Sequence, residues 1–183
     1  GHHGEDLLPP ALGVLAHKTI VPGIILDDGD LKITAYIASH PPIHPAVGYR
    51  FDYRGRSVVI SGDSNVTDET LKIVDGADLL LHDALSLPTV TALSEALGAV
   101  GQSRQSKIVS DVMDYHASTD SLIVLAEQSN VDMVAFYHLV PVPPNSVVED
   151  IFMRGAPDNF LLTEDLMWFD LPIDSDDIIV HHP

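Results

Sequence analysis

Histidine and aspartate residues follow several short apolar segments of this 183-residue chain. Three positions share one design, an apolar run and then a potential metal ligand: Asp63 after residues 58–60, His82 after residues 79–81, and His138 after residues 134–137. His40 ends a further segment that alternates as a strand does. A carboxylate at the end of a buried strand is costly unless a metal, a cation or hydrogen-bond donors accompany it. Imidazole and carboxylate together suit zinc, iron or manganese without selecting among them.

Each of these residues also has a simpler interpretation. A lone histidine after a strand is more often a hydrogen-bonded boundary residue than a metal ligand, and Asp63 after Gly62 is equally suited to a helix cap or a turn. His116, just ahead of Ser118, is by itself most simply a loop residue. The other histidines are assigned to structural or solvated positions, or to the termini: His2, His3, His17, His44, His181 and His182. Spacing alone supports the metal and the non-metal hypotheses equally.

Other chemistries find little support in the sequence. It has no Gly-x-Ser-x-Gly elbow, no lysine-bearing phosphate loop, no dinucleotide fingerprint and no His-Glu-x-x-His motif. Ser61 and Ser64 flank Asp63, but no base is placed beside either hydroxyl. The absence of cysteine removes disulfides, thiolate zinc sites and cysteine nucleophiles together.

The elements that must position the candidate residues are short strands and helices in a regular order. Strands are predicted at residues 23–26, 31–38, 47–53, 57–60, 77–81 and 131–137. Helices are predicted from 67 to 75, 90–97 and 106–113, after a Ser118 cap, and after Ser146, which has capping-box spacing with Glu149. Hairpins followed by alternating helix and strand predict one α/β domain over residues 1–183, with a mixed sheet. Ends of adjacent strands in such a fold meet at one edge, where catalytic groups usually gather.

Composition predicts which partners the chain avoids. With 27 acidic and 9 basic residues, the formal net charge is −18, which should repel phosphate backbones and predicts no nucleic-acid partner. The densest basic group (Arg50, Arg54 and Arg56) lies around a predicted hairpin and is expected to face solvent. No apolar run has transmembrane length and no signal peptide is present, so no membrane partner is predicted. The compartment stays open between cytoplasm and periplasm.

Five pieces of the sequence, in order, resemble a known family: His40-Pro41-Pro42 with residues 45–50, Ser61-Gly62-Asp63-Ser64, residues 79–84, Tyr115-His116-Ala117-Ser118, and residues 137–141. Together they resemble the metallo-β-lactamase-fold hydrolases, and most closely the branch with ribonuclease Z and the arylsulfatase-like enzymes. The resemblance covers roughly residues 1 to 170 of this chain, but only the C-terminal half to two-thirds of a family domain.

The resemblance implies a four-layer αββα sandwich with two metal ions, usually zinc, at one edge. It assigns His40 and His138 as ligands of the two metals and Asp63 as the catalytic carboxylate that bridges them. His116 matches a catalytic histidine that donates a proton or stabilises an oxyanion. His82 matches a position where a histidine–acid pair orients the ligands. A metal-activated water would attack a carbonyl, sulfuryl or phosphoryl centre.

The sequence departs from the family in two respects. The signature His-x-His-x-Asp-His is absent, and no His-x-His occurs anywhere in the chain. Because residues 2–10 resemble a stretch downstream of that motif, the chain is expected to be N-terminally truncated and to lack four metal ligands. Ser64 stands where the family often has threonine, which keeps the hydroxyl.

These departures shape the functional expectation. The chain is interpreted as part of a metal-dependent hydrolase of a small ester, sulfate or phosphate, with zinc bound weakly or not at all and no activity by itself. The sheet surface left uncovered would favour a homo-oligomer. The alternative is a non-catalytic binding or assembly domain that kept the fold without a complete site. Finding His-x-His-x-Asp-His upstream of Gly1 would discriminate between them.

Overall fold

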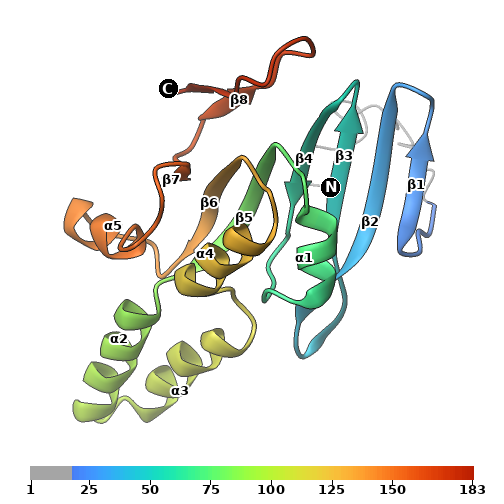
Figure 1. Cartoon of the computed structure of the whole chain (residues 1–183). Helices are drawn as coiled ribbons and strands as arrows, with labels where there is room; N and C mark the ends of the chain where they lie inside the picture. The colour runs from blue at the N-terminus through green and yellow to red at the C-terminus, as the bar shows by residue number, and fades with distance from the viewer. Residues whose placement is uncertain (1–17) are drawn as a thin grey trace, which may run out of the picture.

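The computed structural model describes residues 18–183, and the expectation for residues 2–10 falls outside that range. Its centre is a seven-stranded mixed sheet in the order β1-β2-β3-β4-β5-β6-β7 (Figure 1). The strands are β1 Gly23–Asp27, β2 Leu31–His40, β3 Ile43–Tyr53, β4 Arg56–Ile60, β5 Leu79–Leu85, β6 Met133–Val140 and β7 Phe160–Leu162. The predicted α/β class with a mixed sheet is confirmed.

The sheet changes from antiparallel to parallel at its middle. Pairs from β1 to β4 are antiparallel and are joined by hairpins, whereas β4 to β7 pair in parallel. A parallel pair needs a long crossover, and a helix supplies it after β4 and again before β6. The strands β2, β4, β5 and β6 therefore point the same way, and their carboxyl ends share one edge of the sheet.

Helices lie at the predicted segments, and side-chain caps mark the start of α1, α4 and α5. They are α1 Asp68–Val74, α2 Leu87–Ala99, α3 Ser103–Asp111, the 3₁₀ turn η1 Val112–Asp114, α4 Thr119–Gln128 and α5 Ser146–Phe152. Thr67 and Thr70 form a capping box at α1. The predicted Ser118 cap is confirmed, because its hydroxyl accepts the Ser121 N–H at the start of α4. The predicted cap of the last helix is wrong by one residue, because Asn145 accepts the Val148 N–H and Ser146 already lies inside the helix.

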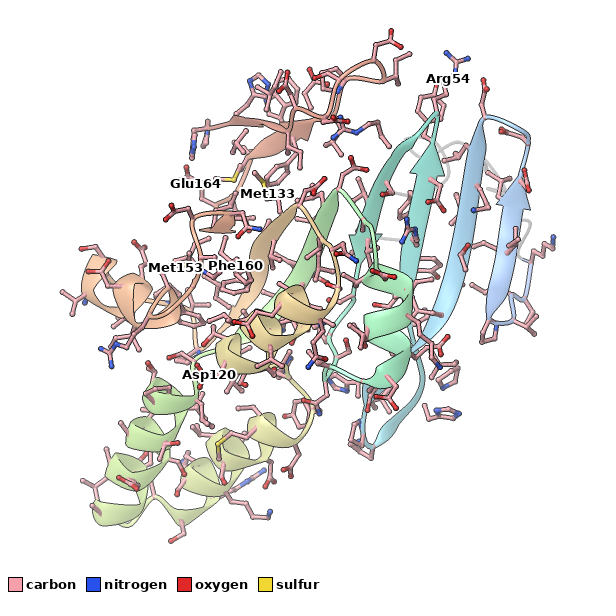
Figure 2. All side chains as sticks on the ribbon, in the orientation of Figure 1. Arg54, Asp120, Met133, Met153, Phe160 and Glu164 are labelled. Atoms are coloured by element: carbon pink, nitrogen blue, oxygen red, sulfur yellow. The ribbon has the colours of Figure 1, made fainter. Side chains whose placement is uncertain are left out.

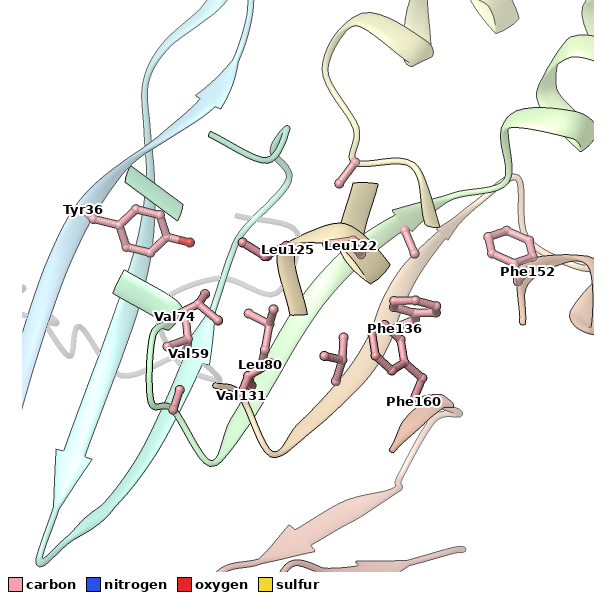
Figure 3. Close-up of a cluster of buried hydrophobic side chains, with 14 residues drawn as sticks. Tyr36, Val59, Val74, Leu80, Leu122, Leu125, Val131, Phe136, Phe152 and Phe160 are labelled. Atoms are coloured by element: carbon pink, nitrogen blue, oxygen red, sulfur yellow. The ribbon is translucent and has the colours of Figure 1, made fainter. Parts of the chain in front are cut away.

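The hydrophobic core lies between the helices and one face of the sheet (Figure 3). Val59, Leu80 and Phe136 come from three neighbouring strands, and none exposes measurable surface. They pack with side chains of three helices: Val74 of α1, Leu122 and Leu125 of α4, and Phe152 of α5. Burial of apolar surface at about 25 cal/mol per Å² makes this contact the main force that holds the helices on the sheet.

The C-terminal segment covers part of the opposite face. Side chains alternate along a strand, so Ile60, Leu81 and Tyr137 face away from the helices. Met167 and Phe169 lie against them around a small cavity. Phe169 belongs to a two-stranded antiparallel sheet, β8 Trp168–Asp170 with β9 Ile179–His181. Through Phe169, this small sheet lies against the face of the seven-stranded sheet that is opposite the helices.

The basic cluster does not face solvent as a unit. Arg54 stands at the tip of the β3–β4 hairpin and pairs with Asp30 at 2.6 Å (Figure 2). Arg56, however, is only 6% exposed, pairs with Asp78 at 2.9 Å, and donates to the carbonyl oxygens of Pro172 and Ser175. The prediction of a solvent-facing Arg56 is wrong because the C-terminal segment, distant in sequence, folds over that residue.

The remaining two helices, α2 and α3, pack mainly against each other. Ser94 of α2 donates to the Ser106 carbonyl of α3 at 2.9 Å, and α3 has no buried residue. Figure 1 shows the pair extending from one end of the sheet. Within residues 18–183, no helix has the length and apolarity needed to cross a membrane.

Candidate active site

The predicted site residues gather at the edge where β2, β4, β5 and β6 end. His40 is the last residue of β2, and Asp63 lies in the loop three residues after β4. His82 and His138 are not at strand ends, because β5 continues to Leu85 and β6 to Val140. His116 comes from the loop between η1 and α4. The shared edge follows from the common direction of these four strands.

Gly62 makes the turn that places Asp63. Its φ of +66° belongs to the left-handed region, and an added Cβ would lie 2.9 Å from the Val47 carbonyl oxygen. Only glycine meets both conditions without strain. The loop is tied to β5 on either side of Asp63, since Ser61 accepts the Asp83 N–H at 3.3 Å and the Ser64 N–H donates to the Asp83 carboxylate at 3.0 Å.

A β-bulge presents His138. Asp83 pairs with Tyr137 and Ala84 pairs with Leu139, so His138 is the extra residue between them. Its φ of +44° is unusual for a residue with a side chain, and a bulge of this kind re-aims a side chain at the edge of a sheet. The His138 Nε2 lies 3.5 Å from the Asp63 Oδ2, and both side chains are about half exposed, at 49% and 46%. The bulge therefore joins two predicted metal ligands.

Asp83 organises the buried side of the site. Its carboxylate is 0% exposed, and its Oδ2 lies 2.8 Å from the His116 Nδ1 and its Oδ1 3.0 Å from the His82 Nδ1. An ionised carboxylate only accepts hydrogen bonds, so both Nδ1 atoms carry the proton. The Ser64 and Ala117 N–H groups donate to the same carboxylate. One buried side chain thus fixes the Asp63 loop, the His116 loop and the His82 ring.

The protonation state of Asp83 follows from these contacts. Burial raises the pKa of the carboxyl group, but the hydrogen bonds from His116 and His82, the charge of His82 and the Ser64 N–H outweigh it and leave the pKa below its usual value. The carboxylate is therefore ionised at neutral pH. Nearby, burial raises the pKa of the Tyr137 phenol, which stays neutral.

Aromatic rings complete the cluster. The His116 ring lies 5.6 Å from the His40 ring and 5.3 Å from the His138 ring, measured between centroids. The Tyr115 ring lies 4.6 Å from His40 and 5.0 Å from His116. His116, only 7% exposed, thus stands between the two predicted histidine ligands.

The types of donor atom at the site suit a divalent metal ion, but among residues 18–183 too few of these donors lie close together to hold one. The His40 Nδ1 is buried without a hydrogen-bond partner, as expected of a nitrogen available to a ligand. Imidazole nitrogen and carboxylate oxygen are zinc donors. In the described part of the chain, however, no three histidine, aspartate or glutamate side chains are arranged closely enough to hold a metal ion. The structure brings Asp63 to His138 and His40 to His116, but it does not unite His40, Asp63 and His138 in one ligand cluster.

Sequence reasoning missed two residues of this arrangement. The resemblance implied only an acid paired with His82 and did not single out Asp83, whose carboxylate also holds His116. The available signal was a carboxylate inside the otherwise apolar segment from 79 to 85, which must find donors when buried. Tyr115 gave no signal of its own, because only the fold brings it against His40.

The fold and this edge cluster define a class of protein. The structure resembles the metallo-β-lactamase fold protein YhfI from Bacillus subtilis, with a TM-score of 0.50, 16% identity, and coverage of 75% of this chain and 48% of that one. It also resembles Zn²⁺-bound PqqB from Methylobacterium extorquens, with a TM-score of 0.55, 13% identity, and coverage of 81% and 53%. The chain has the metallo-β-lactamase fold.

The sequence is also similar to those of named proteins. The chain is 28% identical to ribonuclease Z of Mycobacterium avium over 140 aligned residues. These residues make up 76% of this chain and 45% of the relative. The chain thus spans about half the length of the curated relatives it matches. No family model matches the chain.

These relatives correct one prediction. The exclusion of nucleic acid is contradicted, because a protein named ribonuclease Z acts on RNA. The error was to treat the net charge of −18 as a property of the site. Net charge describes the average surface, whereas phosphate is attracted by the field at one edge, where a bound cation would be the largest charge.

Proposed function

We propose that residues 18–183 contribute part of the active site of a metal-dependent phosphodiester hydrolase, with RNA among its substrates. The observation that carries the proposal is the Asp83 network, which holds His116 beside the Asp63–His138 pair. The relatives named ribonuclease Z support phosphodiester chemistry over the ester and sulfate substrates that the sequence left open.

The proposed ligands are His40, Asp63 and His138. These residues would hold two divalent metals, zinc above others, and Asp63 would supply a carboxylate oxygen to both. A bound metal supplies an acidified water and offsets negative charge on phosphoryl oxygens. The exposed positions of Asp63 and His138 leave room for this chemistry, and the bulge and the Gly62 turn hold the two side chains together without it.

His116 is proposed to exchange the proton. Asp83 accepts the hydrogen bond from the Nδ1 of His116, so the Nε2 is the ring nitrogen left to take up or give a proton. The ionised Asp83 also stabilises the imidazolium that forms when the Nε2 is protonated. A carboxylate–histidine pair of this kind fixes both tautomer and ring orientation.

A zinc titration of the 183-residue protein tests the ligand assignment, by competition with a chromogenic chelator at pH 7. We expect weak binding that Asp63→Asn and His138→Asn each reduce, and no turnover of a chromogenic phosphodiester. His44→Asn is the matched control, since His44 is exposed on β3 outside the cluster. Comparison between variants removes the contribution of terminal histidines.

Two results would overturn the proposal. Equal zinc affinity in wild type, Asp63→Asn and His138→Asn would show that these side chains are not ligands and would favour a binding or assembly domain. Tight stoichiometric zinc with turnover by this chain would contradict an incomplete site.

A further inference from the structure

A pocket of about 540 Å³ adjoins the candidate active site on the side of α3. We call it the Tyr115 pocket. Pro41 and Pro42 line it from the β2–β3 turn, Ile108 lines it from α3, and Tyr115 lines it from the loop before His116. Its volume lies within the range of small-molecule sites, which are mostly apolar with a few polar groups at the rim. Two proline rings and an aromatic ring make its walls stiff.

The charges at the rim do not favour a phosphate. Lys107 is held by Asp111, with its Nζ 2.8 and 3.0 Å from the two carboxylate oxygens. Asp114 also lines the pocket, so one ammonium faces two carboxylates. An anionic group would meet net repulsion here, whereas an uncharged group with hydrogen-bond donors would not.

Tyr115 connects this pocket to the cluster. The same ring that lines the pocket lies 4.6 Å from the His40 ring and 5.0 Å from the His116 ring. A planar group placed against Tyr115 therefore lies directly beside the residues proposed to act on the phosphodiester. The pocket and the cluster suit the two halves of a nucleotide, an uncharged flat base and a charged phosphate.

We propose that the Tyr115 pocket binds the base of the nucleotide next to the scissile phosphodiester, by stacking on Tyr115. This inference rests on the proposed function and adds to it where the base lies and which residue selects it. Stacking of a base on an aromatic side chain is sequence-tolerant and contributes about 1–3 kcal/mol. Tyr115 is thus a specificity-determining residue that favours nucleotide over simple phosphoesters.

The test is binding without metal, so that it does not depend on hydrolysis. Adenosine 5′-monophosphate and ribose 5-phosphate are titrated by calorimetry into the 183-residue protein in a chelator, and saturation-transfer NMR locates the contact. We expect the nucleotide to bind through its base protons, and ribose 5-phosphate to bind far more weakly. Tyr115→Ala should weaken nucleotide binding about 5- to 150-fold, the range that corresponds to one stacked base, while Tyr115→Phe keeps it.

Two further variants keep the test decisive. Ile108→Glu adds a negative charge at a residue that is 54% exposed, so it should fold and still weaken binding. Tyr53→Ala is the matched tyrosine control, since Tyr53 is 43% exposed at the hairpin end of β3 and should bind as wild type does. Absent nucleotide binding, equal binding of ribose 5-phosphate, or an unchanged affinity in Tyr115→Ala and Ile108→Glu would each overturn the inference.

Discussion

Replacement of Asp83 by asparagine should both destabilise the protein and reverse the tautomer of His116. The carboxylate is 0% exposed and accepts from His116 at 2.8 Å and from the Ala117 N–H at 3.4 Å through the same oxygen. Asparagine keeps one oxygen, which can retain the Ser64 contact. It places an NH₂ group where two donors now point, so His116 must move its proton to Nε2 and accept at Nδ1.

The size of the effect follows from the kind of hydrogen bond lost. A hydrogen bond to a charged group contributes about 1.5–3 kcal/mol, and an unsatisfied buried donor costs about 1–3 kcal/mol. Because His116 can reorganise, we expect Asp83→Asn to lower the free energy of unfolding by about 2–4 kcal/mol, well above the resolution of a urea titration.

The assay pairs urea unfolding with long-range ¹H–¹⁵N NMR of the histidine rings at pH 7. The matched control is Asp63→Asn, the same change at a carboxylate that is 46% exposed and 3.5 Å from its histidine. It should cost less than about 0.5 kcal/mol, as surface substitutions usually do. If Asp83→Asn costs no more than Asp63→Asn and the His116 tautomer is unchanged, the buried network does not hold His116.

Two further predictions concern pH and glycine. The pKa of Asp83 is lower in the folded protein than the value of about 3.9 expected in the unfolded chain. Its contribution to stability is therefore present above about pH 3.9 and is lost as the pH falls through the lower folded pKa. The urea midpoint should drop on acidification from pH 5 to pH 3, and it should drop less in Asp83→Asn. An equal drop in both proteins would contradict this. Gly48→Ala should destabilise by about 1–3 kcal/mol, because the new Cβ would overlap the buried Tyr36 ring. Gly98→Ala in α2 should stabilise by about 0.5–1 kcal/mol, since its Cβ would lie 3.5 Å from the Ser106 Oγ, and melting temperatures that moved together would refute the distinction.

Local sequence determined much of the architecture. The hydrophobic period, the Arg54-Gly55 turn, the acidic residues after Thr67 and the Ser118 cap predict strands and helices that the structure contains. Each of these features depends on only a few neighbouring residues, so it can be recognised from the sequence without knowledge of the fold. Boundaries failed where pairing extends a strand: β5 and β6 run past His82 and His138 because each continues to pair with the other.

For the candidate site, too, the sequence indicated some features and only the tertiary structure decided the others. Residue types and spacing made His40, Asp63 and His138 candidate metal ligands without deciding for or against a metal. The ordered pieces around them indicated the resemblance, and only that resemblance assigned a role to His116. Tertiary structure decided which side chains meet: Asp63 with His138 across a bulge, His116 with Asp83, and Tyr115 with His40. Such contacts join segments 33 to 75 positions apart in the chain. No local pattern encodes them, because they depend on strand direction, on one left-handed residue in β6 and on the desolvation of a single carboxylate.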